Sequence, residues 1–456
     1  MRAGPHRAVR KSEPNKWNRT GINRPDMPAQ ARLTATEEAR LIAALEGALL
    51  VAAKARSVDH GLLFQVLALR DAPDSALREL RDLLSVVQAT PALEFFDHAY
   101  QCCLGNWEEV DFHFLVEWLI SRGQEVGTRQ TVNDVARYLE SETIEVTELL
   151  AIDGFRVKRN IELGEYGLVA WNHVEMTDTK YQLAARGLFG SKTPTAAVIR
   201  RHQVRRLHAR PWDSLGPNVP LPLEPVLDVL RCVTAVAGAG FRLLHYWLEP
   251  EEWAPWAVNR LHFGVDSRAN PWTIELSEAV VPQLRDSVSH LRILDESSRL
   301  RLRVPLDRLN RSYCAGMRSV DTAIELGIAI ESLYAPAKLY DGIASAIRTR
   351  AARFLGGSLE QRRGTFKALR DVYDLRSRAV HAGRFDAKGK HKNWRDDVLV
   401  RKVLEEGQRL IGRSLVKVIQ EGEPNWEEFD RGGVESTSVT AADAQPVIPT
   451  DGFPAC

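Results

Sequence analysis

The sequence predicts an α+β protein of several domains, in which a region of mixed helices and short strands precedes a C-terminal all-α bundle of four to five helices. The first observation is length, since 456 residues correspond to about two to four domains of roughly 100–200 residues each. The second is composition: 44% hydrophobic and 27% charged residues are typical of globular proteins and exclude a fibre. The third is periodicity, because apolar residues alternate in the middle of the chain and recur at helical spacing on either side.

The two ends of the chain have opposite charge. Residues 1–32 carry eight Lys or Arg against Glu13 and Asp26, which predicts a disordered basic arm, either solvated or touching phosphate groups. From Glu423 onward seven acidic residues are opposed by one arginine, and residues 426–456 are predicted to be a disordered acidic tail. The net charge of +1 therefore conceals an uneven distribution.

Residues 33–142 are predicted to be mainly helical. Thr34 or Thr36 is expected to open the first helix, because leucines follow at helical spacing. Two further helices are expected over Ser75–Val87 and Trp107–Ile120. This region contains no pattern that indicates catalysis.

Residues 143–305 are predicted to be mixed α/β. From Val146 to Trp171 apolar and polar residues alternate between glycines, which is typical of short strands and turns. Another strand is expected within residues 195–210, and an apolar helix over Val226–Val236.

Residues 306–425 are predicted to form the helical bundle. Short loops separate segments whose apolar residues recur at helical spacing, as in other helical bundles. Ala382–Gly383 is a typical helix end. The expected helices are Asp321–Tyr334, Ile343–Leu355, Arg362–Val380 and Val398–Gln420.

The sequence lacks the common motifs of metal and cofactor enzymes. It has no P-loop, no GxGxxG after a strand, no HExxH, no CxxC pair and no GxSxG, and Cys102 and Cys103 are adjacent rather than at zinc spacing. We therefore expect neither metal nor cofactor. Five cysteines do not suggest a disulfide framework, and the charge-free stretch Val233–Phe241 is too short to span a membrane. With no apolar signal-peptide core either, we expect a cytoplasmic protein without a membrane partner.

Basic residues are concentrated near the C-terminal end of the bundle. Residues 348–402 contain sixteen Lys or Arg and six Asp or Glu, a balance of +10 in 55 residues. A concentration of this size indicates a phosphate-binding surface.

One arginine and one histidine in this basic segment indicate phosphodiester chemistry. Arg376 falls on the apolar stripe of its predicted helix, so its guanidinium must line a cleft, pair with an acid or face a partner subunit. His381 is expected at the helix end, where the helix dipole favours the imidazolium. An imidazole transfers protons to and from oxygen atoms, and a guanidinium stabilises the charge on phosphoryl oxygens.

These residues resemble the HEPN domain, specifically its Apea-like branch of prokaryotic anti-phage and toxin-type proteins. The resemblance covers about residues 306–425 and rests on Arg376-Ser377-x-x-x-His381, which matches the family's Arg-polar-x-x-x-His motif. The stretch from Ala329 to Leu333 resembles an upstream family helix, and Ala382 stands where the family commonly has glycine.

The resemblance implies a metal-independent endoribonuclease that acts as a homodimer and leaves 2′,3′-cyclic phosphate and 5′-OH ends. His381 is then the acid and base, Arg376 clamps the phosphate, and Ser377 donates an auxiliary hydrogen bond. Glu331 either orients Arg376 or forms a structural ion pair with it, and Tyr373 packs beside them. The expected contacts to the RNA backbone are Arg378, Arg384, Lys388, Lys390 and Lys392.

Two functions agree with these observations, one catalytic and one non-catalytic. The preferred one is a ribonuclease effector in anti-phage defence or growth control, with residues 33–305 binding a trigger or regulator. The alternative is a non-catalytic HEPN module that binds RNA, a nucleotide or a partner protein. The motif is short, and Arg285–His290 fits it too. We prefer Arg376–His381 because its flanking residues and basic surroundings also agree.

Overall fold

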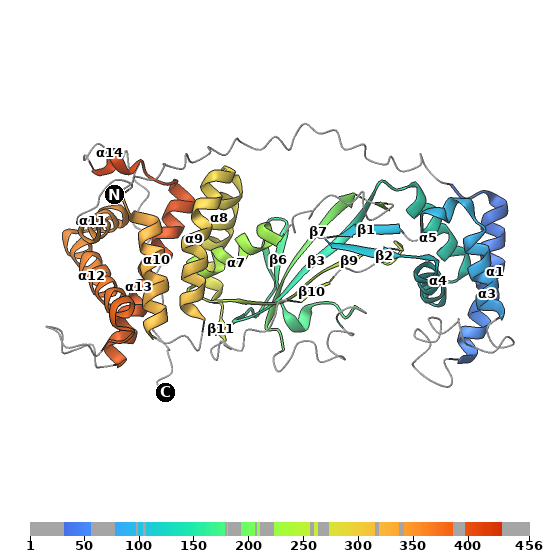
Figure 1. Cartoon of the computed structure of the whole chain (residues 1–456), viewed down its shortest axis with the longest axis horizontal. Helices are drawn as coiled ribbons and strands as arrows, with labels where there is room; N and C mark the ends of the chain where they lie inside the picture. Colours follow the sequence, from blue (N-terminus) through green and yellow to red (C-terminus); the bar gives the residue numbers. More distant parts are fainter. Residues whose placement is uncertain are drawn as a thin grey trace, which may run out of the picture. The chain divides into compact units, whose positions relative to one another are not determined.

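The protein has a mixed α+β fold that is mostly helical, as predicted (Figure 1). A computed structural model of the chain describes residues 32–55, 78–96, 99–103, 106–177, 180, 193–205, 208–209, 223–255, 260–262, 273–314, 319–336, 342–385 and 397–430. The predicted basic arm, apart from Arg32, and residues 431–456 of the predicted tail lie outside these residues. Within them, every helix is too short or too polar to cross a membrane.

The chain divides into two compact units, which are described separately. Unit 1 comprises Met1–Leu149, Arg201–Pro222 and Trp247–Leu261. Unit 2 comprises Leu150–Arg200, Leu223–Tyr246 and His262–Cys456. The predicted boundaries at residues 142/143 and 305/306 are sequential, whereas the compact units are built from interleaved segments.

The described residues of unit 1 include the helices α1 (Ala35–Ala55), α3 (Arg78–Gln88), α4 (Phe112–Val126) and α5 (Thr128–Glu140). Of the two predicted caps, Thr34 opens α1. Its Oγ1 accepts from the Glu37 amide at 3.3 Å, and the Glu37 carboxylate accepts from the Thr34 amide at 2.6 Å. This reciprocal pair is a capping box.

The predicted helix over Trp107–Ile120 is wrong in its first part. Residues Asn106–Val110 form strand β2, which pairs antiparallel with β1 (Ala99–Cys103), and β1 also pairs with β8 (His208–Ala209). The helix begins only after Asp111, whose carboxylate accepts from the Phe114 amide at 2.8 Å. A Ser, Thr, Asn or Asp at this capping position decides where a helix starts.

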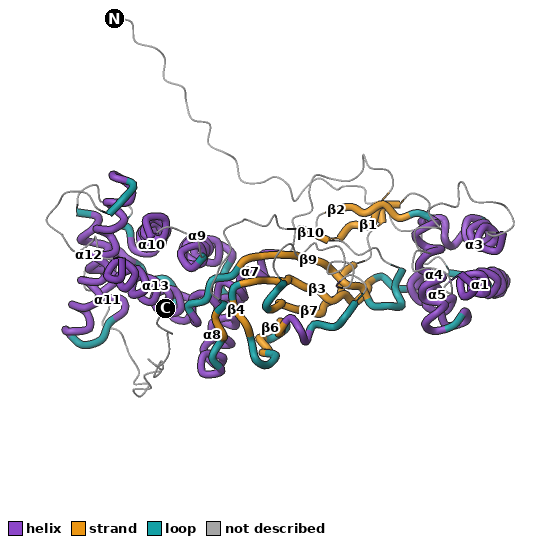
Figure 2. The backbone as a smooth tube through the Cα atoms, turned by 90° about the horizontal axis from the view of Figure 1, so that it is seen from below, coloured by secondary structure: helices purple, strands orange, loops and turns teal. Residues whose placement is uncertain are grey.

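A six-stranded sheet has the order β10-β9-β3-β7-β6-β5 (Figure 2). Its strands are β3 (Thr143–Asp153), β5 (Ile161–Leu163), β6 (Tyr166–Ala170), β7 (Ala196–Arg205), β9 (Arg242–Pro250) and β10 (Arg260–His262). Strand β6 runs antiparallel to both β5 and β7, and the short β4 (Phe155–Arg156) pairs in parallel with β11 (Ile274–Glu275). The strands predicted within residues 146–171 and 195–210 are confirmed. The described residues also include 3-10 turns: η3 (Pro91–Phe96) after α3, η4 (Trp171–His173) after β6 and η6 (Glu278–Val280) before α8.

A glycine is required where β4 and β9 approach each other. Gly154 has φ +124°, and a Cβ there would lie 2.2 Å from the carbonyl oxygen of Gly240. Both the backbone conformation and the contact exclude a side chain.

Unit 2 contains the helical bundle. Its helices are α7 (Leu223–Ala237), α8 (Val281–Ile293), α9 (Glu296–Tyr313), α10 (Ser319–Tyr334), α11 (Ile343–Leu355), α12 (Leu359–Ala382), α13 (Asp397–Glu421) and α14 (Trp426–Asp430). The five predicted helices in this unit are present as α7 and α10–α13, with ends within three residues of those expected. The predicted start of the bundle at residue 306 falls inside α9, because that helix continues through Pro305 and packs on α10.

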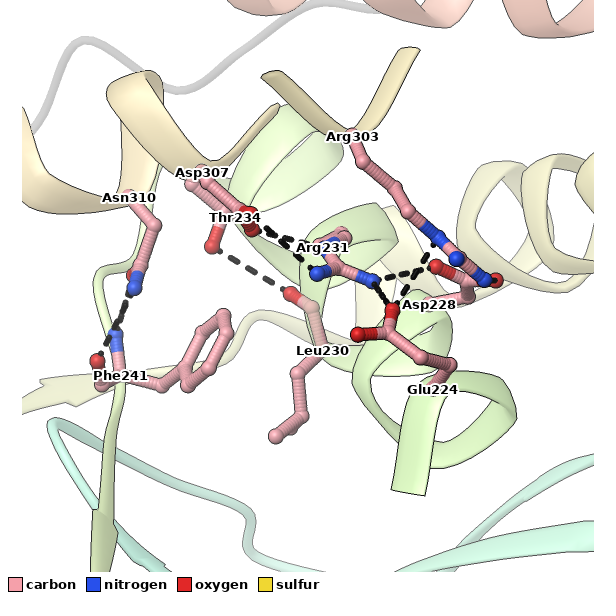
Figure 3. Close-up of polar contacts among 9 residues, drawn as sticks. All are labelled: Glu224, Asp228, Leu230, Arg231, Thr234, Phe241, Arg303, Asp307 and Asn310. Carbon is pink, nitrogen blue, oxygen red and sulfur yellow. Dashed lines mark hydrogen bonds and ion pairs between the residues drawn. The ribbon is translucent and has the colours of Figure 1, made fainter. Parts of the chain in front are cut away.

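An ion-pair network connects α7 and α9 (Figure 3). Arg231 is 4% exposed, and its nitrogen atoms donate to Asp307 at 2.7 Å, Asp228 at 2.6 Å and Glu224 at 2.8 Å. Burial acts to lower the pKa of Arg231, but these hydrogen bonds outweigh it and raise the pKa above its ordinary value. Arg303 adds a second cation, 3.3 Å from Asp228. The network therefore holds Arg231 charged inside the protein.

Helix α14 lies in the predicted acidic tail but is folded onto the bundle. Asp430 accepts three hydrogen bonds of 2.6–3.1 Å from the buried Arg350 of α11. Trp426 stacks edge-on against Tyr334 and Phe354, with ring centroids 5.5 and 5.7 Å away. Acidic composition suggested disorder, but these aromatic contacts and the buried counter-ion fix residues 426–430.

Candidate functional site

Helix α12 carries the predicted catalytic motif. Ser358 and Gln361 form a capping box at its start, where the Ser358 side chain accepts from the Gln361 amide at 3.2 Å. It ends as predicted at Gly383, which has φ +63° and donates its amide to the Ala379 carbonyl at 3.0 Å. Because the helix is continuous, the directions of its side chains follow from its periodicity.

Arg376 is paired with Glu331 of α10. The distance from Nη2 of Arg376 to Oε2 of Glu331 is 3.2 Å, and both side chains are about a quarter exposed (26% and 29%). The hydroxyl of Tyr373 donates to the same carboxylate, and the Arg376 guanidinium lies 5.6 Å from the centre of the Tyr373 ring. Of the alternatives for Arg376, pairing with an acid is the one observed within the chain.

Gly327 makes room for this arginine. A Cβ at Gly327 would lie 2.4 Å from Cγ of Arg376, closer than real carbon contacts allow. The Arg376 stem therefore passes directly against the backbone of α10. This contact could not be predicted from the sequence, because it depends on the register between two helices.

The cluster leaves one arginine donor unused. Nε of Arg376 is buried and has no hydrogen-bond partner among the described residues. A buried donor without a partner costs about 1–3 kcal/mol. The guanidinium is therefore not saturated by its protein contacts.

The hydroxyl of Tyr373 is held neutral. Burial first, and then the hydrogen bond and negative charge of Glu331, raise the pKa of Tyr373 to about 12, against the opposing charges of Arg376 and Arg348. Arg348 lies on α11 with its guanidinium 5.1 Å from the centre of the Phe366 ring. Sequence reasoning missed Arg348 because it counted the residue only toward the basic total.

His381 does not join this cluster within one chain. It is exposed, in the last turn of α12, and makes no hydrogen bond or ion pair with any described residue. Five residues after Arg376 it points about 140° away around the helix, and Ser377 points about 100° away. Within one chain, Arg376 and His381 therefore point to different sides of α12.

The other predicted contacts are only partly described. Arg378 is half-buried on α12, and Arg384 is exposed just beyond its end. Lys388, Lys390 and Lys392 lie outside the described residues.

The competing motif match is a surface feature. Arg285 donates to the Glu162 carbonyl at 2.8 Å, and Nδ1 of His290 lies 3.1 Å from the Asp286 carboxylate of its own helix. Arg285 thus contacts strand β5 and His290 contacts α8 itself, so this pair serves as a control in mutagenesis.

The described residues include no group of three or more His, Cys, Asp or Glu arranged to hold a metal ion. No protein-family model matches the chain, and no curated protein or solved structure is significantly similar to it.

Proposed function

We propose that the C-terminal bundle is a metal-independent endoribonuclease of the HEPN type. It would act in the cytoplasm, in anti-phage defence or toxin-like growth control. The observation that supports it is Arg376: a positioned, partly exposed arginine with an unused buried Nε, on the helix that ends in an exposed histidine. These are the two groups that RNA cleavage through the 2′-OH needs.

In the proposed reaction the ribose 2′-oxygen attacks the adjacent phosphorus while the imidazole of His381 accepts the hydroxyl proton. The bond from phosphorus to the 5′-oxygen breaks, and that oxygen takes a proton from a protonated His381, leaving a 2′,3′-cyclic phosphate and a 5′-OH. Arg376 binds the phosphoryl oxygens, and Ser377 adds a hydrogen bond. The phosphate competes with Glu331 for the guanidinium, and Tyr373 remains a neutral donor.

The angle of about 140° between Arg376 and His381 requires a second chain in this scheme. We therefore include a homodimer through the bundle in the proposal, in which each site takes groups from both protomers. Residues 33–305 are proposed to bind the trigger or regulator of the enzyme.

The test is cleavage of labelled total RNA in EDTA by the wild type, His381→Ala and Arg376→Ala. We expect cyclic-phosphate ends from the wild type, and loss of at least about 100-fold in rate for His381→Ala, the usual contribution of a general acid or base. The Arg285→Ala/His290→Ala variant is the matched control and should cut like the wild type. Cleavage that survives His381→Ala contradicts the proposal.

The alternative is a non-catalytic module that binds RNA, a nucleotide or a partner protein. The observation that favours it is that Arg376 is already paired with Glu331 and points away from His381. A wild type that binds RNA without cutting it, also as a dimer, supports this alternative.

A further inference from the structure

Helix α12 has a basic stripe on the side opposite its buried face. Taking Arg363 as the reference direction, Lys367, Arg370 and His381 all lie within about 40° of it around the helix. All four side chains are exposed. The buried residues of α12 point the other way: Thr365, Leu369, Val372, Leu375 and Ala379.

The charges on this stripe are poorly neutralised. Arg363 and Lys367 form no ion pair with any described residue, and Arg370 contacts only its sequence neighbour Asp371, at 3.0 Å. The one carboxylate directly on the stripe is Asp374. Three cations thus precede His381 along one line.

The outer face of α13 shows what an ordinary solvated helix surface looks like. There Arg409 pairs with Glu406 at 2.5 Å and Lys417 with Glu421 at 3.6 Å. Arg401 and Lys402 are also exposed and are followed within one turn by acidic residues, whereas the exposed Arg413 between Arg409 and Lys417 is not. On the α12 stripe, Asp371 and Asp374 also follow Lys367 and Arg370 within one turn, but Arg370 is the only one of the three cations that forms an ion pair with a described residue.

We infer that the α12 stripe binds the backbone of single-stranded RNA and leads it to His381. From Arg363 to His381 the stripe covers 18 residues, or about 27 Å along the helix axis. Cations in a row recognise successive phosphates without reading bases. The site deepens the RNA-directed function proposed above and rests on it, but it uses residues that the HEPN-like motif does not include.

The test is the affinity for a fluorescent 2′-O-methyl RNA oligonucleotide, measured by anisotropy over a range of salt concentrations. This probe lacks the attacking 2′-OH, so binding is read without cleavage. Arg363→Gln/Lys367→Gln should weaken binding and reduce the slope of log affinity against log salt by about 1.4, since each single-strand phosphate contact contributes about 0.7. The control Arg401→Gln/Lys402→Gln removes the same charge from α13 and should leave the slope unchanged.

Equal losses of RNA affinity from both double variants, or no loss from the α12 variant, contradict the proposal that the stripe binds RNA. Equal binding of anionic phosphatidylserine vesicles that is lost with the same α12 substitutions also overturns it, because the surface then recognises a membrane. Cleavage assays distinguish a failure of the stripe proposal from a failure of the proposed nuclease function. Cleavage that depends on His381 but not on Arg363 or Lys367 rejects the stripe alone, and stripe-dependent binding without cleavage rejects the nuclease alone.

Discussion

Two arginines of unit 2 occupy very different environments. Arg231 is buried, and all three of its nitrogen atoms donate to carboxylates of α7 and α9. Arg376 is a quarter exposed, donates through one nitrogen to Glu331, and keeps its Nε buried without a partner in the described part of the chain.

The difference distinguishes an arginine that stabilises the fold, Arg231, from one that can bind a ligand, Arg376. A guanidinium has five donors in a planar fork, and a stabilising ion pair uses most of them. Arg231 does so, and any ligand would have to displace three acids. Arg376 donates to one acid only and keeps its buried Nε without a partner among the described residues, so a phosphate would have one acid to displace.

The largest expected effect is the loss of stability when Arg231 is replaced. Arg231→Met leaves Asp228 buried beside other carboxylates, and we expect unfolding to become easier by about 3 kcal/mol. Arg376→Met should cost at most about 1 kcal/mol, because the pair that it removes is partly exposed. Urea denaturation of the two variants measures both. Similar losses for both would show that Arg376 is structural as well.

The next effect concerns the space that Gly327 provides. Gly327→Ala places a methyl group against Cγ of Arg376, and we expect a loss of about 1–3 kcal/mol. The control is Gly364→Ala on α12, where nothing lies within 4 Å and better helix propensity should add up to about 1 kcal/mol. Combining Gly327→Ala with Arg376→Ala should recover part of the loss in a double-mutant cycle. Strictly additive losses would mean that the two residues do not touch.

The smallest effect is the titration of Tyr373. Its pKa is raised to about 12 by burial and by Glu331, so Glu331→Gln should lower it toward the ordinary value of about 10. Ultraviolet absorbance between pH 9 and 13 measures this, with Tyr373→Phe subtracted as the reference.

The same shift has a consequence for stability. Because the pKa is raised in the folded state, the contribution of Tyr373 is complete below about pH 10 and is lost as the pH rises through about 12. In Glu331→Gln the contribution should be smaller, and its loss should be complete at a lower pH. A Tyr373 titration that is the same with and without Glu331 contradicts the contact.

The sequence predicted most where local signals decide the structure. The ends of α10–α13 follow from helical spacing and from glycines such as Gly383, and the start of α1 follows from Thr34. It failed for β2, because Trp107 and the apolar residues after it fit a helix as well as a strand until Asp111 is recognised as a cap.

The candidate site could likewise be predicted from the sequence only in part. The pairing of Arg376 with Glu331 was one of the alternatives weighed from the sequence, because both residues lie on predicted helices of one bundle. Gly327 and Arg348 could not be found in this way, since only the packing of α10, α11 and α12 brings them to the site. The direction of the His381 side chain follows only once α12 is known to be continuous from Arg376 to His381. The sequence did predict where this helix ends.

The contact between Asp430 and Arg350 sets the minimum length of an autonomous fragment. A fragment that ends at residue 425 would keep every long helix of the bundle but lose the counter-ion of a buried guanidinium and two rings of an aromatic cluster. One that ends just after Asp430 keeps both. The folding unit thus extends into the stretch whose composition resembles a tail, and its last essential charge is supplied by the final residue of α14.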